Sequence, residues 1–191
     1  MFDPEVVLGI IDKKIYNNSA FGDLLSADNK ESLMKKSVIR TIEAGQVLCE
    51  QNQYSNSLFL ILKGEMRISS KSSGKETSLG TLNEGELVGE ISALFMTPRI
   101  ATATATQPSI VLEISGEVFS DILSADPNIE REFFKRCKNM IIETTLRCSP
   151  VFNNLDAQSF SELCYISSIE TVMENHVICH EGTMEKIMYV I

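Results

Sequence analysis

No stretch of this sequence is long and apolar enough to cross a bilayer. A membrane-spanning helix needs about 20 consecutive apolar residues, and no run in the 191-residue chain approaches that length. The first nine residues include Asp3 and Glu5, in place of the basic and then apolar pattern of a secretory leader. We therefore expect a protein without a membrane span that resides in the cytoplasm.

Basic charge is also scarce. The chain has 17 lysines and arginines against 26 acidic residues, which gives a formal net charge of -9. Charge of this sign repels nucleic-acid phosphates at long range, so nucleic acid is not expected as a partner. The five cysteines are odd in number and irregularly spaced, which favours free thiols over a disulfide framework.

The common signatures of catalysis are missing from the sequence. It shows no Ser/His/Asp set, no glycine fingerprint for a dinucleotide and no phosphate loop with its lysine. These absences give no support for an enzyme, and we expect a binding protein that needs no cofactor.

The pattern of apolar residues predicts an α+β fold. Hydrophobic residues make up 43% of the chain, enough to bury one core. Helical spacing covers 1–35, and short β-branched or alternating runs broken by turn residues fill 38–114. The expected strands include 46–49, 57–62, 66–69, 77–82 and 101–106. Helical spacing returns after Ser115, breaks at Asp126-Pro127 and continues to about residue 147. We expect an antiparallel, jelly-roll-like β-roll with N-terminal helices and two C-terminal helices.

An internal repeat organises the chain. A shift of 130 positions, without a gap, aligns nine identical residues. They are Leu25, Ala27, Leu33, Ser37, Ile39, Thr41, Val47, Cys49 and Ile61, which meet Leu155, Ala157, Leu163, Ser167, Ile169, Thr171, Val177, Cys179 and Ile191. The chain is thus expected to hold a helical lead (1–20), one complete domain (21–147) and the start of a second copy (148–191).

The repeat also bears on a candidate metal site. His176 and His180 are four residues apart, which would suit a metal on a helix. The repeat instead places them at the positions of Gln46 and Glu50, in expected strands. No metal site is therefore expected.

Residues 85–104 carry the chemistry of the first domain. Gly89 allows a sharp turn, Glu90 follows it, and a short apolar stretch can form one helical turn before Thr97-Pro98. Arg99 then stands between Pro98 and apolar neighbours, where burying it unpaired would cost several kcal/mol, so it requires an anion. Its guanidinium fits two phosphate oxygens, and the carboxylate of Glu90 can accept a bond from a hydroxyl. Together these groups favour a ribose phosphate as ligand.

The segment resembles the phosphate-binding cassette of the cyclic nucleotide-binding domains. The shared elements are Gly89-Glu90, then Thr97-Pro98-Arg99-x-Ala-Thr nine residues later, the upstream Gly45-x-Val-Leu, the strand 58–64 that ends in Gly64, and Leu82-x-x-Gly85. The likeness covers about 21–147, and 146–191 resembles the opening of a second such domain. In the turn before the 58–64 strand, Asn52 and Ser55 occupy places where family members have glycines, and asparagine tolerates a left-handed backbone.

The resemblance implies a role for each part of the cassette. Arg99 would hold the exocyclic oxygens of a cyclic phosphate, Glu90 would bind the ribose 2′-hydroxyl, and backbone amides would complete the cradle. A residue on or after the long helix, such as Phe133, Phe134 or Met140, could cover the base, although core packing is the favoured role for the two phenylalanines. Ile100 occupies a position where receptors that prefer cyclic GMP have threonine, so cyclic AMP is favoured over cyclic GMP. The expected site residues are Gly89, Glu90, Ile91, Ser92, Arg99, Ile100 and Ala101, with Leu79, Leu82 and Val88 bordering the purine or the sugar.

The function implied is that of a regulatory module. It would bind a cyclic nucleotide and transmit the event to an output domain or effector outside this chain, and it could form a homodimer. The alternative is a ligand-free structural copy of the domain, in which Arg99 pairs with Glu90 or another carboxylate and the helices serve for dimerisation or docking. A transcription factor that shares the roll would need a basic helix-turn-helix after the long helix, where a second roll is expected instead.

Overall fold

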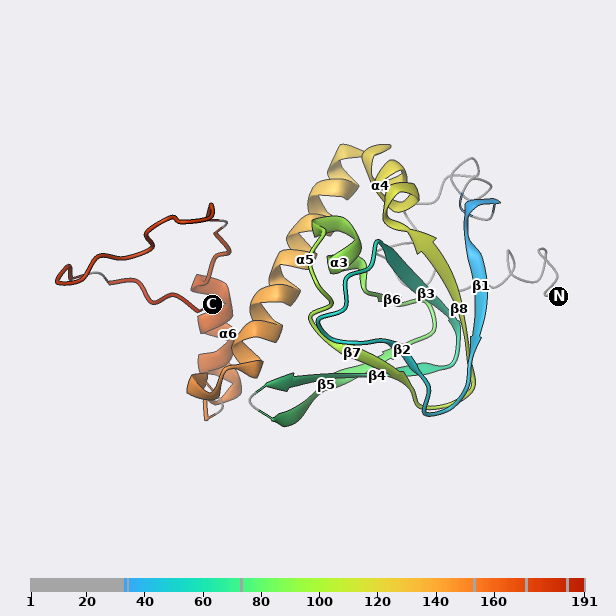
Figure 1. Cartoon of the computed structure of the whole chain (residues 1–191), viewed down its shortest axis with the longest axis horizontal. Coiled ribbons are helices and arrows are strands. Elements are labelled where there is room, and N and C mark those ends of the chain that lie inside the picture. The colour runs from blue at the N-terminus through green and yellow to red at the C-terminus, as the bar shows by residue number, and fades with distance from the viewer. Residues whose placement is uncertain are drawn as a thin grey trace. The chain divides into compact units, whose positions relative to one another are not determined.

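A computed structural model of the chain describes residues 33, 35–72, 74–152, 154–170, 172–184 and 186–190, with Ile129 described by its backbone alone (Figure 1). Most of the helical region expected over 1–35 lies outside these residues, although Leu33, Lys35 and Lys36 are helical. The chain divides into two compact units, 1–137 and 138–191, and each is described by itself.

The first unit contains two four-stranded antiparallel sheets. One has the order β1-β8-β3-β6 and the other β2-β7-β4-β5. The strands are β1 (Val38–Ile42), β2 (Val47–Cys49), β3 (Ser57–Lys63), β4 (Glu65–Ser72), β5 (Lys75–Asn83), β6 (Leu87–Val88), β7 (Thr102–Ala105) and β8 (Ser109–Ser115). Each of the five strands expected in 46–106 is present, and the expected α+β roll is confirmed.

The core of the roll is built from both sheets. Residues 58–62 of β3 are all buried, as befits a strand that pairs on both edges and has both faces covered. In β7 the small side chains Ala103 and Ala105 are buried while Thr102 and Thr104 are partly exposed, which explains the Thr/Ala alternation. The central buried cluster contains Ile42, Cys49, Phe59, Ile61, Met66, Val88, Ala103, Ala105 and Val111.

Helices accompany the roll after β6 and after β8. They are α3 (Glu90–Phe95), α4 (Gly116–Ser124) and α5 (Pro127–Cys148), and α4 and α5 meet at the predicted break. The hydroxyl of Ser115 caps α4 by accepting a bond from the Val118 amide. The fully buried Phe119 of α4 meets Phe133 of α5 edge to face, with ring centroids 5.3 Å apart. In Figure 1, α3, α4 and the start of α5 lie at the same end of the roll.

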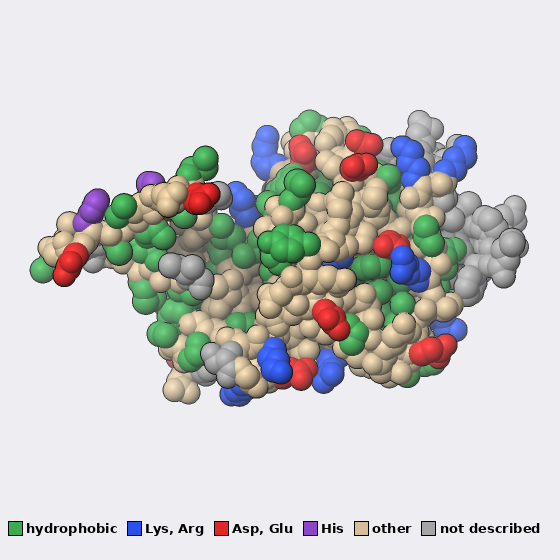
Figure 2. Space-filling view, viewed as in Figure 1, with side chains coloured by type: hydrophobic (Ala, Val, Ile, Leu, Met, Phe, Trp, Pro, Cys, Tyr) green, Lys and Arg blue, Asp and Glu red, His purple; other side chains and the backbone are tan. Residues whose placement is uncertain are grey.

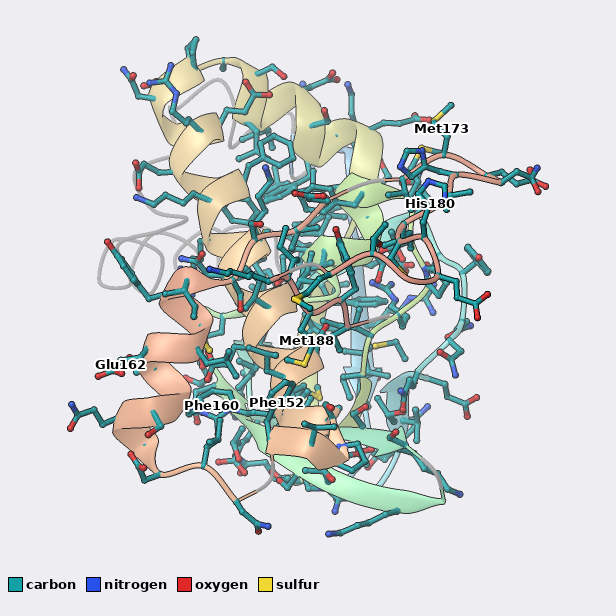
Figure 3. All side chains as sticks on the ribbon, turned by 90° about the vertical axis from the view of Figure 1, so that its left-hand side faces the viewer. Phe152, Phe160, Glu162, Met173, His180 and Met188 are labelled. Atoms are coloured by element: carbon teal, nitrogen blue, oxygen red, sulfur yellow. The ribbon has the colours of Figure 1, made fainter. Side chains whose placement is uncertain are left out.

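The second unit includes the end of α5, the short helix η2 (Pro150–Phe152) and α6 (Ala157–Ile166). Asp156 caps α6 by accepting bonds from the amides of Gln158 and Ser159. The Arg147 guanidinium lies over the Phe160 ring, 4.6 Å from its centroid, and donates two hydrogen bonds to Glu143. Figure 3 shows Phe160 on α6 and Met173, His180 and Met188 on the segment that follows.

The prediction of strands after α6 is wrong for the described residues. None of the described residues in 167–190 forms a strand, so His176 and His180 lie in irregular chain. In the first unit β1 pairs with β8 and β2 with β7. Apolar side chains such as Met173 and Met184 are exposed in this segment. Figure 2 shows green hydrophobic side chains at the surface of the part of the chain that carries the two purple histidines.

None of the helices in the described ranges has the length and apolar character needed to span a membrane.

Candidate functional site

The expected cassette forms the crossing between the two sheets. It leaves β6 of one sheet and enters β7 of the other, with α3 in between. Gly89 has φ 81 and Met96 has φ 53, so the backbone is left-handed on both sides of the short helix. These reversals let one turn of helix fit into the crossing, and they bring Gly89 and Arg99 together.

The side chain of Arg99 is buried and held by backbone carbonyls. It is 2% exposed. Its Nη1 donates to the Gly89 carbonyl and its Nη2 to the Ser57 carbonyl, each at 2.6 Å. Its Cζ lies 5.8 Å from the centroid of the Phe59 ring, within cation–π range. The guanidinium is thus held at the crossing between the two sheets and against the core of the roll.

Arg99 lacks two of its possible partners in the described part of the chain. In the described part of the chain, no carboxylate lies within ion-pairing distance of the guanidinium. Its buried Nε also has no hydrogen-bond partner there. The Arg99–carboxylate pair of the ligand-free alternative is therefore not what these residues show, and the Nε–H of Arg99 is an unused donor among them.

The loop between β2 and β3 holds the main chain of Arg99. The Asn52 amide donates to the Arg99 carbonyl at 2.8 Å, and the Arg99 amide donates to the Gln53 carbonyl at 2.9 Å. Asn52 has φ 66, which confirms the left-handed turn that its asparagine suggested. The contributions of Ser57 and Gln53 were missed in the sequence, because both act through carbonyl groups that every residue carries.

Glu90 is buried beside the first half of α5. It is 6% exposed. Burial raises the pKa of its carboxyl. A hydrogen bond from the backbone of Glu90 itself and the charges of Arg136 and Arg99 oppose that rise. Burial also raises the pKa of the Cys137 thiol to about 12, with the charge of Glu90 adding to the rise. Arg136 and Cys137 of α5 therefore lie within electrostatic reach of Glu90, an arrangement that no local sequence pattern indicates.

Aromatic packing joins the same two helices. Phe95 of α3 and Phe134 of α5 meet edge to face, with centroids 5.4 Å apart. Phe133 packs on Phe119, so each of the two aromatic candidates for covering a base has a packing partner within the domain. Met140, the third candidate, lies in the second unit and is half-buried.

The remaining expected residues lie around the cassette or on β5. Ile91 and Ser92 are buried on α3, and the Ser92 hydroxyl donates to the Pro98 carbonyl at 3.3 Å. Ile100 and Ala101 are half-buried in the bend before β7. Val88 belongs to the core cluster and Leu82 packs against it, while Leu79 is half-buried on the edge strand β5.

Comparison with known proteins agrees with this architecture. Residues 39–126 match the family model of the cyclic nucleotide-binding domain, so the expected resemblance is confirmed over that range. A cGMP-dependent protein kinase from Eimeria tenella is 25% identical over 158 residues, which are 83% of this chain and 15% of that protein. The chain thus spans a small part of the relative's length.

Two solved structures share the fold. The regulatory domain of Toxoplasma gondii PKA with cAMP superposes with a TM-score of 0.56 at 18% identity, covering 86% of this chain and 59% of that one. The regulatory subunit of a cAMP-independent protein kinase A from Trypanosoma cruzi, bound to guanosine, gives a TM-score of 0.59 at 16% identity, covering 83% and 50%.

Gly89→Ala should displace Arg99. A Cβ at position 89 would lie 1.8 Å from Nη1 of Arg99, whereas one at Gly45, with nearly the same φ of 82, would meet nothing within 4 Å. Both alanines carry a left-handed strain of about 1 kcal/mol, and Gly89→Ala adds about 1–3 kcal/mol of overpacking. Urea unfolding of both variants measures the difference. Equal losses of stability would contradict the close approach.

Glu90→Gln should change how stability depends on pH. Because the folded pKa of Glu90 lies above its ordinary value of 4.5, the unfolded state releases the proton first as the pH rises. The contribution of Glu90 to stability is therefore complete below about pH 4.5 and is lost as the pH rises through the folded pKa.

Unfolding free energies from pH 4 to 8 should thus fall for the wild type relative to Glu90→Gln. Glu117→Gln removes the same charge from the exposed side of α4 and controls for net charge. Parallel pH curves for wild type and Glu90→Gln would show that the carboxyl is not held in a desolvated position.

Proposed function

We propose that residues 39–126, which match the cyclic nucleotide-binding domain, bind a cyclic nucleotide and act as a regulatory module. The observation that carries this proposal is the buried guanidinium of Arg99, which has an unused donor and no carboxylate partner in the described part of the chain. A buried cation of this kind is stabilised by an anion that accepts from its planar donors. A cyclic phosphate supplies one negative charge and two free oxygens.

The two charged residues of the cassette suit different parts of such a ligand. Arg99 would bind the phosphate, and Glu90, at the other side of the α3 turn, would accept a hydrogen bond from the ribose 2′-hydroxyl. The amides of Gly89, Ser92 and Ile100 would complete the cradle around the phosphate. Glu90 and Arg99 are not ion-paired with each other in this structure, which leaves each one available for its own group.

Cyclic AMP is proposed over cyclic GMP because of Ile100. A threonine at this position would offer a hydroxyl to the guanine amino group, and the isoleucine side chain has no polar atom. The names of the relatives support both nucleotides, since one is a cGMP-dependent kinase and another structure contains cAMP. The preference therefore depends on position 100.

Transmission of binding would run through α5. The cassette helix α3 contacts α5 through the rings of Phe95 and Phe134, and the charge of Arg136 acts on the Glu90 carboxyl over a longer range. The helix α4 contacts α5 through Phe119 and Phe133. A ligand that draws the segment 90–95 inward would act on both sets of contacts and so on an output domain or effector outside this chain, to the extent that its affinity differs between the two arrangements.

Arg99→Ala should remove most of the affinity for cyclic AMP. The wild type should be stabilised by about 2.7 kcal/mol in cyclic AMP at about 100 times its dissociation constant. Loss of the guanidinium should cost about 2–5 kcal/mol of binding free energy, because a buried phosphate loses its counter-charge. Titration calorimetry with both nucleotides measures the effect, and Arg67→Ala, which removes an exposed arginine of β4, is the matched control.

Undiminished binding by Arg99→Ala would remove Arg99 from the site. A wild-type melting curve that does not move in millimolar cyclic AMP or cyclic GMP would favour the ligand-free alternative, in which the domain serves for dimerisation or docking.

Ile100→Thr should shift the preference toward cyclic GMP. One added hydrogen bond contributes about 1 kcal/mol, which is about a fivefold change in the ratio of the two dissociation constants. Ile100→Val is the matched control, because valine has the shape of threonine without its hydroxyl. Competition titrations of both nucleotides give the ratio. If threonine and valine changed it equally, shape alone would explain the preference.

A further inference from the structure

We propose that Asn52 is a positioning residue for Arg99: its left-handed backbone lets the loop between β2 and β3 hold Arg99 by main chain and side chain together. The inference rests on the proposed function and deepens it, since it names a residue outside the cassette on which phosphate binding depends. Asn52 itself is exposed and lies 47 positions before Arg99 in the sequence.

The loop contacts Arg99 at three points. The Asn52 amide donates to the Arg99 carbonyl at 2.8 Å, and the Gln53 carbonyl accepts from the Arg99 amide at 2.9 Å. The Ser57 carbonyl, where the loop becomes β3, accepts from Nη2 of Arg99 at 2.6 Å. The loop therefore fixes both the main chain of Arg99 and the position of its guanidinium.

The loop is itself anchored. The Gln51 amide donates to Oγ1 of Thr102 in β7 at 3.0 Å, and Oε1 of Gln51 accepts from the Lys71 amide of β4 at 2.6 Å. Within the loop, the Gln53 amide donates to the Glu50 carbonyl at 3.2 Å. These bonds tie one end of the loop to β4 and β7, and Ser57 ties the other end to the opposite sheet. A change in the loop's backbone cannot be absorbed at its ends.

The φ angle of Asn52 controls the arrangement. This angle describes rotation about the N–Cα bond of Asn52. The bond lies between the Asn52 amide, which donates to Arg99, and the Gln53 carbonyl, which accepts from Arg99. Rotating φ from 66 to the right-handed region would therefore turn one of these groups away from Arg99. Asparagine and glycine adopt a positive φ with little strain, whereas a β-branched residue does not.

The experiment compares variants of two asparagines. Asn52→Val should weaken binding of cyclic AMP at least tenfold in titration calorimetry, and Asn52→Ala should weaken it less. Asn52→Gly should stay within about threefold of the wild type, which is the rescue expected if the backbone angle matters. The matched control is Asn175→Val, because Asn175 has φ 64 in the other unit. This control should leave the affinity unchanged.

A second readout needs no ligand. The buried Nε–H of Arg99 should give a slowly exchanging NMR signal, assigned by its loss in Arg99→Lys. In Asn52→Val, and to a smaller extent in Asn52→Ala, the signal should move and exchange faster with solvent. Asn52→Gly and Asn175→Val should leave it in place, although Asn175→Val carries the same backbone strain.

The outcomes separate this inference from the proposed function. If the wild type binds cyclic AMP and Asn52→Val binds it equally well with an unchanged Arg99 signal, the positioning role is overturned and the function stands. If the wild type binds neither nucleotide, the proposed function fails, and the NMR signal decides the positioning role alone. If Asn52→Val does not fold, the comparison of Asn52→Ala with Asn52→Gly carries the same decision.

Discussion

The structure of the first unit depends on keeping one guanidinium buried. A charged group taken out of water costs several kcal/mol unless it is paired and hydrogen-bonded. Arg99 recovers part of that cost from two carbonyl dipoles and the face of Phe59, and in the proposed complex a phosphate supplies the opposite charge. The need to bring carbonyls this close explains why position 89 has no Cβ and why a loop more than 40 residues upstream bonds to the Arg99 backbone.

The same constraint accounts for the separation of charges within the cassette. Arg99 and Glu90 are both buried, yet they do not form an ion pair with each other. Arg99 is held by carbonyls from β3 and from the turn after β6, while Glu90 lies near Arg136 of α5. A direct ion pair between the two would have neutralised the site. In the proposed complex, keeping them apart would provide one subsite for an anion and another for a hydroxyl donor, a combination suited to a ribose phosphate.

Several parts of this arrangement could be predicted from the sequence, because they depend on local chemistry. Arg99 between Pro98 and Ile100, the Thr/Ala alternation of β7 and the helix break at Asp126-Pro127 each have a local cause. The carbonyls of Ser57 and Gln53 could not be predicted, since a backbone group has no side-chain signature. The approach of Arg136 to Glu90 could not be predicted either, because it depends on how α5 packs. The strands expected after α6 were wrong for the described residues: β1 and β2 each form by pairing with a strand distant in the sequence, and a local sequence repeat does not show whether such pairing takes place.

The electrostatic interaction between Glu90 and Arg136 of α5 also relates the proposed binding at the cassette to the packing of that helix. A hydroxyl that donates to a carboxylate favours its ionised form and lowers its pKa. In the proposed complex, the ribose hydroxyl would therefore offset the burial that raises the pKa of Glu90. A more fully ionised Glu90 would attract Arg136 more strongly, so in the proposed complex binding at the cassette and packing of α5 would reinforce each other. The edge-to-face contact of Phe95 with Phe134 has no charge and does not respond to ionisation. In the proposed complex, the interaction of Glu90 with Arg136 would therefore respond to the ligand, whereas the apolar contact between the same helices would not.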